Sequence, residues 1–244
     1  MYTWVPFTLF KRSIIFFNSF IGTLSGEFLP PQVIYQGITE ARHAQYDFPL
    51  AWDINHSPNH WANQHTQSDY TKKIMLPHIA KTKQKLSSPS SQKTLCIFDV
   101  FRAQIGKEFL QELKDNHICI VFVSPPCTDN LQPMDLSVQK AVKDKMKQRF
   151  QIWYSKSLCK QLEKGIDIND LSPVDLRLSI VEPLAAEWLF QTYIDIKADN
   201  KLIDKGYFFL LYCFAEEFIY CFWKTNNFFR QWYFQTAEIK IRRK

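Results

Sequence analysis

The sequence predicts an α/β fold, on the strength of three observations. Two short apolar runs, residues 94–101 and 117–123, enclose an amphipathic segment at 103–116, which is the pattern of a β-α-β unit. Another pair of β-rich runs lies within residues 13–36. The 244 residues are 46% hydrophobic and 22% charged, which is enough apolar material for a core and excludes a wholly disordered chain.

Ahead of the β-α-β unit, the sequence predicts a hairpin, a long connection and a helix. Residues 13–20 and 28–36 are rich in Ile, Val and Phe and flank a turn-forming stretch, so they predict a β-hairpin. Residues 37–63 are rich in His, Asn, Asp and Pro and predict a long irregular connection. Apolar spacing over residues 61–81 predicts a helix, and the polar stretch 81–93 predicts a surface loop.

The β-α-β unit itself predicts a parallel pair of buried strands with a right-handed crossover. Its first strand carries a single carboxylate, Asp99, near its end. After the second strand and a loop, Pro133 suits the first turn of a long helix that contains Asp135. The apolar stripe of that helix caps the sheet and comprises Val138, Val142, Met146, Phe150 and Trp153.

Asp99 and Asp135 form a candidate site for a divalent metal ion. Ligands of open α/β sheets bind beyond the carboxyl ends of parallel strands, and both residues are expected at that edge. Two ionised carboxylates repel unless a cation such as Mg²⁺ bridges them, and such a site suggests phosphodiester chemistry. In the structural alternative, Asp99 hydrogen-bonds a turn and Asp135 caps a helix. The spacing alone leaves both interpretations open.

Five segments give the sequence a family resemblance. They are GEFLPPQVIYQG (26–37), WDINHSPNHW (52–61), IFDVFRAQ (97–104), VFVSPPCTDNLQPMDLSV (121–138) and SPVDLRLSIVEPL (172–184). In these segments the chain resembles the DDE superfamily endonuclease domain of pogo, Tigger and jerky-type transposases and of the host proteins derived from them. The resemblance covers residues 13–206. It leaves residues 1–12 as an unrelated N-terminal extension and residues 207–244 as an aromatic-rich tail.

The resemblance implies an RNase H-like mixed sheet flanked by helices, in which the hairpin and the Asp99 strand share one sheet. It also implies metal-dependent cleavage and transfer of double-stranded DNA, with Mg²⁺ or Mn²⁺ as cofactor and a nuclear location. Carried over residue by residue, Asp99 is the second and Asp135 the third of three carboxylates that are both catalytic and metal-binding.

The first carboxylate of the family belongs on a strand just upstream of the hairpin. No Asp or Glu precedes Glu27 in this chain. We therefore expect an N-terminally truncated domain that lacks its first strand and is catalytically defective, because two-metal chemistry needs ligands for both ions. Two alternatives stay open: an active nuclease in which Glu27 or Glu40 replaces the missing acid, and a protein-interaction module without nucleic-acid chemistry.

DNA is the expected partner, bound weakly and without sequence preference. The net charge is +6, and a basic face lies opposite the apolar stripe of the long helix, formed by Lys140, Lys143, Lys145, Lys147 and Arg149. Lys140, Lys143 and Lys147 are the residues of this face expected to bind the phosphates. A solvated helix face is the competing interpretation.

Other features point away from several function classes. His56, His60 and His65 have no neighbouring Cys and make a poor zinc site. The six cysteines form no C-x-x-C pair, so reduced thiols are expected. The apolar run 207–223 contains Glu216 and Glu217, which argues against a membrane-spanning helix.

Overall fold

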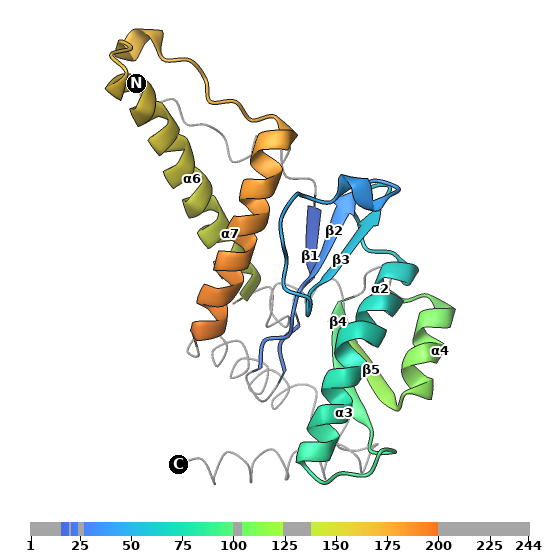
Figure 1. The fold of residues 1–244 in the computed structure, drawn as a ribbon. Helices are drawn as coiled ribbons and strands as arrows, with labels where there is room; N and C mark the ends of the chain where they lie inside the picture. The colour runs from blue at the N-terminus through green and yellow to red at the C-terminus, as the bar shows by residue number, and fades with distance from the viewer. Residues whose placement is uncertain (1–15, 20, 24–26, 100–103, 124–137, 200–244) are drawn as a thin grey trace, which may run out of the picture.

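A computed structural model describes residues 16–19, 21–23, 27–99, 104–123 and 138–199, which form two small sheets with helices packed around them (Figure 1). The strands are β1 (Phe16–Ser19), β2 (Gln32–Gln36), β3 (Asp53–Ser57), β4 (Thr94–Asp99) and β5 (Ile118–Val123). The α-helices are α2 (Gln64–Tyr70), α3 (Leu76–Lys85), α4 (Lys107–Asp115), α6 (Lys140–Glu163) and α7 (Leu178–Ala198). Short helical turns are η1 (Glu40–Arg42), η2 (Thr71–Met75) and η6 (Ile168–Asp170).

The predicted hairpin is confirmed. Strands β1 and β2 pair antiparallel, and an isolated bridge between Gly22 and Phe28 continues the pairing toward the turn. All four residues from Gln32 to Tyr35 are buried, so β2 is covered on both faces and forms the centre of its sheet.

The third strand of this sheet, β3, contradicts the prediction of an irregular connection over residues 37–63. It runs parallel to β2, with Gln32 opposite Asp53. Only Ile54 among its five residues is apolar, so the sequence carries little β signal. Its polar side chains find partners instead: Asp53 contacts Gln32, and Asn55 donates to Asp69 at 3.2 Å. Side-chain pairing across elements, which propensity does not register, makes this segment a strand.

The predicted β-α-β unit is confirmed. Strands β4 and β5 are parallel with Asp99 opposite Val123, and α4 connects them. The expectation that this pair shares a sheet with the hairpin is wrong for the described residues, because the hydrogen bonds join β1-β2-β3 in one sheet and β4-β5 in another. Strand β1 pairs only with β2, and β4 only with β5, so each leaves one edge without a strand neighbour in this part of the chain.

The predicted helix at 61–81 is confirmed with shifted ends and an internal irregularity. It consists of α2, the π-helical turn η2 and α3. Asn63 sets its start through a capping box, in which its side chain accepts from the Thr66 amide while the Thr66 hydroxyl accepts from the Asn63 amide.

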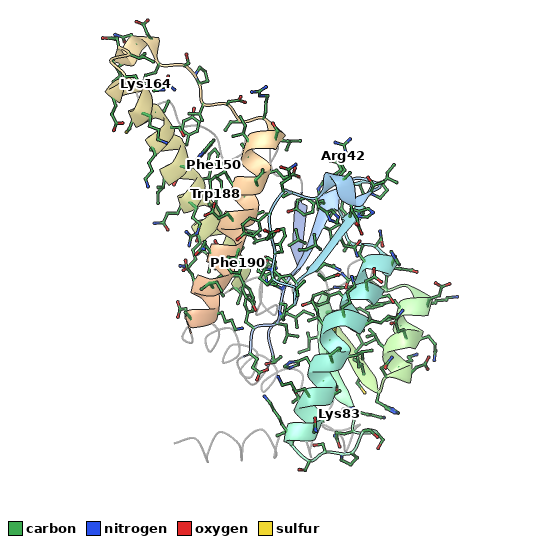
Figure 2. The ribbon with its side chains drawn as sticks, in the orientation of Figure 1. Arg42, Lys83, Phe150, Lys164, Trp188 and Phe190 are labelled. Carbon is green, nitrogen blue, oxygen red and sulfur yellow. The ribbon has the colours of Figure 1, made fainter. Side chains whose placement is uncertain are left out.

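The long helix predicted after Pro133 is present as α6, although its start at Asp135 lies outside the described residues. Gly165, with φ at +84°, ends it in a left-handed conformation that glycine adopts without strain. The chain then returns as α7, which the sequence did not signal. In Figure 2, Phe150 and Trp188 lie where the two helices face each other, with ring centroids 6.2 Å apart.

Two hydrophobic clusters hold these elements together. The first joins the β1-β2-β3 sheet to α6 and α7; Tyr193 stacks on Phe28 and meets Trp52 edge to face. The second joins β4 and β5 to α4 and the α2–α3 helix, with Phe109 and Leu113 at its centre. Both faces of the β1-β2-β3 sheet are therefore covered by helices (Figure 1). None of the described helices contains a stretch apolar and long enough to cross a bilayer.

Candidate functional site

Asp99 is the last residue of β4, at the carboxyl end of the parallel pair β4-β5. This is the edge at which the sequence places it and at which α/β sheets bind ligands. The chain that follows β5 carries Asp135, which lies outside the described residues, as does the side chain of Asp99. The backbone places Asp99 at this edge, and the position of Asp135 beside it stays a prediction.

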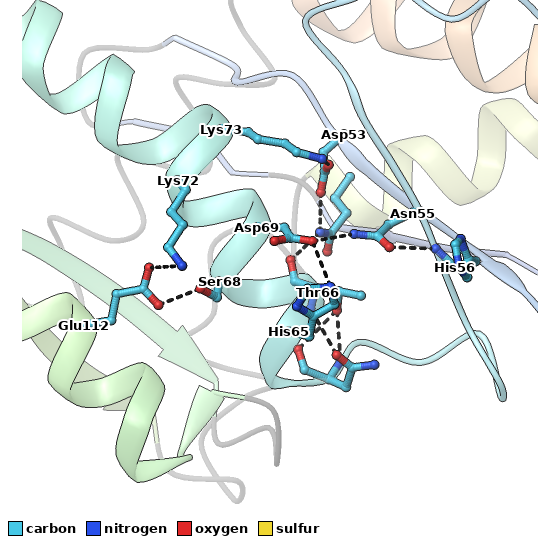
Figure 3. Close-up of polar contacts among 12 residues, drawn as sticks. Asp53, Asn55, His56, His65, Thr66, Ser68, Asp69, Lys72, Lys73 and Glu112 are labelled. Atoms are coloured by element: carbon cyan, nitrogen blue, oxygen red, sulfur yellow. Dashed lines mark hydrogen bonds and ion pairs between the residues drawn. The ribbon is translucent and has the colours of Figure 1, made fainter. Parts of the chain in front are cut away.

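The start of α2 lies beside the segment that follows Asp99. Gly106 packs so closely against the Gln64 side chain that a Cβ at position 106 would collide with its amide group. Two polar contacts hold α4 against the same helix: Ser68 donates to Glu112 at 2.6 Å, and Lys72 pairs with Glu112 at 3.5 Å (Figure 3). The β4 edge is thus bordered by α4 and by the turn that leads into α2.

A buried polar group lies where α2 packs against β2 and β3, and the sequence did not single it out. The Asp53 side chain is fully buried; it accepts from Gln32 Nε2 at 2.6 Å and from Lys73 Nζ at 2.7 Å (Figure 3). The hydrogen bond to Asp53 raises the pKa of Lys73. Gln32 also donates to the Thr66 carbonyl, so this group joins β2, β3 and α2. A lone Asp in a polar run gave no signal of that role.

The three histidines considered as a metal cluster are not brought together. His56 contacts His43 instead, with Nδ1 and Nε2 3.2 Å apart. His65 pairs with Asp69 at 3.5 Å, and His60 lies in the turn after β3. Burial, together with the neighbouring His56, lowers the pKa of His43.

The donor set fits a divalent metal only in part. Oxygen ligands such as Asp99 and Asp135 suit Mg²⁺ or Mn²⁺. Over the residues that the structure describes, no group of three or more His, Cys, Asp or Glu side chains converges. Burial raises the pKa of the Cys96 thiol to about 12, so that thiol is a poor ligand and nucleophile.

Glu27 and Glu40, the two residues proposed to replace the missing acid, lie in other parts of the fold. Glu27 lies 3.5 Å from His78 and forms an ion pair with Lys85 at 3.8 Å, and both contacts tie it to α3. Glu40 is exposed in η1, after the end of β2.

The basic face of α6 divides into two parts. Lys140 and Lys143 are exposed, and Lys147 is half-buried. Lys145 and Arg149 turn toward α7, where both pair with Asp195, at 3.3 and 2.8 Å. Of these five cations, Lys140 and Lys143 are exposed, whereas the other three are half-buried.

Comparison with known proteins identifies one family. Residues 22–172 match the family model of the DDE superfamily endonuclease, which is more than half of the chain. No curated protein and no solved structure matches. The matched range contains β2 to β5, Asp99, Asp135 and the basic face of α6.

Proposed function

Because the chain belongs to the DDE superfamily endonuclease family, we propose that it is a transposase-derived domain that binds DNA and retains two of the three catalytic carboxylates. The observation that carries this proposal is the position of Asp99, at the carboxyl end of a parallel strand pair inside the matched residues. Members of this family use divalent metal ions, which activate water and stabilise the oxygens of the phosphodiester. DNA as the partner also favours a nuclear location.

In the proposed site, Asp99 and Asp135 supply oxygen ligands for Mg²⁺ or Mn²⁺. Lys140 and Lys143 bind the phosphates of the duplex from the helix that follows Asp135, without reading its sequence. Residues 1–26 contain no carboxylate side chain, and Glu27 is engaged with His78 and Lys85. This polypeptide therefore binds one metal ion weakly and does not cleave DNA.

An RNase H-like arrangement is part of the same proposal. The open edges of β1 and β4 are the two that one additional strand between them would pair, and that strand carries the first carboxylate in the family. Packing of α7 on the β1-β2-β3 sheet, beyond the matched residues, supports a domain that extends to residue 206.

The metal site is tested by calorimetry with Mn²⁺. We expect the Asp99→Asn, Asp135→Asn double variant to lose the binding that the parent shows, because both proposed ligands are neutralised. The matched control is Glu163→Gln with Asp170→Asn, two exposed carboxylates near the α6–α7 connection, which should bind like the parent. Equal binding by all three proteins would remove the metal site. Supercoiled plasmid should stay intact with parent protein in Mg²⁺ or Mn²⁺; nicking that Asp99→Ala abolishes would reveal a substitute acid and an active nuclease.

DNA binding is tested by fluorescence anisotropy with a duplex at several salt concentrations. For Lys140→Glu with Lys143→Glu, the slope of log affinity against log salt should fall by roughly 2, about 0.9 for each lost phosphate contact. The control is Lys160→Glu with Lys164→Glu, which makes the same charge change at the other end of α6. No duplex binding by the parent would favour the protein-interaction alternative.

A further inference from the structure

Trp61 stands out among the aromatic residues of the described core. It is 47% exposed, whereas Trp52 and Trp188 are 7% and 8% exposed. It lies in the turn between β3 and α2. An exposed indole loses part of the stabilisation that burial gives to a large aromatic ring.

The turn holds Trp61 in a fixed position. The Ser57 hydroxyl donates to the Trp61 carbonyl at 2.9 Å, and the Trp61 amide donates to the Asn59 side chain at 3.3 Å. The capping box at Asn63 anchors the next turn. The exposed ring is therefore attached to a rigid backbone on both sides.

His60 adds backbone strain to this turn. Its φ of +57° is left-handed, which is unfavourable for a residue with a side chain. Its ring lies 5.4 Å from the Trp61 ring, with 31° between the planes, and its buried Nδ1 has no hydrogen-bond partner within the described residues. The strained conformation places the His60 ring beside the Trp61 ring but gives the imidazole Nδ1 no hydrogen-bond partner among the described residues. Strain of this kind is characteristic of binding sites.

The turn borders the edge that carries Asp99. Gln64, three residues after Trp61, contacts Gly106 in the segment that follows β4. Two basic residues flank this contact in the sequence: His65, whose side chain is 81% exposed and lies 3.5 Å from Asp69, and Lys107, which is exposed at the start of α4. Trp61, His65 and Lys107 thus lie on two adjoining parts of the chain, the β3–α2 turn and the start of α4, which meet through Gln64 and Gly106.

We propose that this surface, Trp61 with His65 and Lys107, binds single-stranded DNA next to the acidic edge, with an unpaired base stacked on the Trp61 indole. The inference rests on the proposed function, since it identifies the form of DNA that this domain holds. Bases stack on exposed aromatic rings regardless of their identity, and basic groups contact the adjoining phosphates. A paired base already stacks on its neighbours inside the duplex, so this ring selects an unpaired one.

The test compares three 12-nucleotide probes by fluorescence anisotropy: oligothymidine, an abasic strand of the same length, and a duplex. Trp61→Ala should weaken binding of oligothymidine roughly 5- to 100-fold, the range for loss of one stacked base, and leave the abasic strand and the duplex unaffected. Trp61→Phe, which keeps a ring, should restore most of the affinity. Lys107→Glu should weaken oligothymidine and the abasic strand alike, because it removes a phosphate contact.

Ile168→Ala is the matched control, because Ile168 is 70% exposed and lies in η6, away from the β3–α2 turn. Circular dichroism of each variant confirms that the fold is kept. Equal affinity of Trp61→Ala and Ile168→Ala for oligothymidine overturns the stacking surface, and the proposed function survives if duplex binding persists. A parent protein that binds none of the three probes contradicts both proposals. Binding of the abasic strand as tightly as oligothymidine also overturns base stacking.

Discussion

At the scale of single residues, Asp53 shows how a polar side chain determines local structure. Its carboxylate is fully buried, while the Lys73 side chain that neutralises it is 57% exposed and keeps its stem over the pair. Gln32 has one amide proton on Asp53 and the other on the Thr66 carbonyl, and its own Oε1 has no partner in the described residues. This network specifies which strand lies beside β2.

The Asp53→Asn variant should reduce the free energy of unfolding by about 1–3 kcal/mol, because the amide that replaces one carboxylate oxygen no longer accepts from both Gln32 and Lys73. Urea denaturation measures the change. Combining it with Lys73→Met should cost less than the sum of the two single changes, since both remove the same contact. Asp170→Asn, at an exposed site, is the control and should stay within about 0.5 kcal/mol of the parent. Additive effects of the two changes would mean that the pair is not energetically coupled.

The His43–His56 contact makes stability depend on pH. The pKa of His43 lies below its ordinary value of 6.5, mainly because of burial, with a further contribution from His56, while Glu40 opposes the shift. The unfolded chain therefore takes up a proton more readily than the folded one, and stability falls as the pH drops below 6.5 toward the lowered value.

In the parent, we expect the midpoint temperature of thermal unfolding to decrease as the pH is lowered from about 7 to about 5. His43→Gln removes the titrating group and should flatten that dependence. His78→Gln is the comparison, because burial also lowers the pKa of His78 and its removal should flatten the profile independently. Parallel profiles for the parent and His43→Gln would show that His43 does not contribute.

At the scale of elements, α6 and α7 are joined by an apolar seam and by one carboxylate. Asp195 on α7 pairs with both Lys145 and Arg149 on α6, while Lys140 and Lys143 are the exposed cations of that face. Sequence periodicity identified the whole basic face, but periodicity carries no information about a carboxylate on a helix 50 residues away.

Asp195→Asn should therefore have opposite effects on stability and on DNA affinity. The free energy of unfolding should fall by about 0.5–1 kcal/mol, a typical value for a partly exposed ion pair. Duplex affinity should rise, because two cations are released beside the phosphate-binding face. Denaturation and anisotropy measure the two effects. Asp170→Asn makes the same charge change elsewhere, and an equal rise in affinity for that variant would mean that net charge alone is responsible.

Elements that were predictable share one property: their signal is local. The hairpin, the β4-α4-β5 unit and α6 have apolar residues at regular spacing, and the sequence placed each of them. Strand β3 was missed because its stability comes from partners on β2 and α2 rather than from its own residues. Asp99 was predicted at a strand end because its signal is local. The Trp61 turn was not predicted, because it is positioned by a contact between Gln64 and Gly106, some 40 positions apart in the chain.

At the scale of the whole molecule, the strands separate into two sheets and two hydrophobic clusters. The sequence predicted one sheet, because family resemblance supplies a topology in which a further strand lies between the two groups. In the described residues no strand lies between the two groups, so hydrogen bonds join only the strands within each group. The α2–α3 helix contacts both groups, so the two clusters are joined through a helix rather than through a shared ladder.

The contact between the Tyr193 hydroxyl and the Phe28 carbonyl joins residues 165 positions apart. During synthesis at about 5–20 residues per second, the hairpin emerges on the order of ten to thirty seconds before α7 does. Over that interval Val33 and Tyr35 have no helix to cover them, while the cluster around Phe109 and Leu113 has already received all of its residues. The cluster around Phe109 and Leu113 therefore has all of its residues in the nascent chain before α7 is available to cover Val33 and Tyr35.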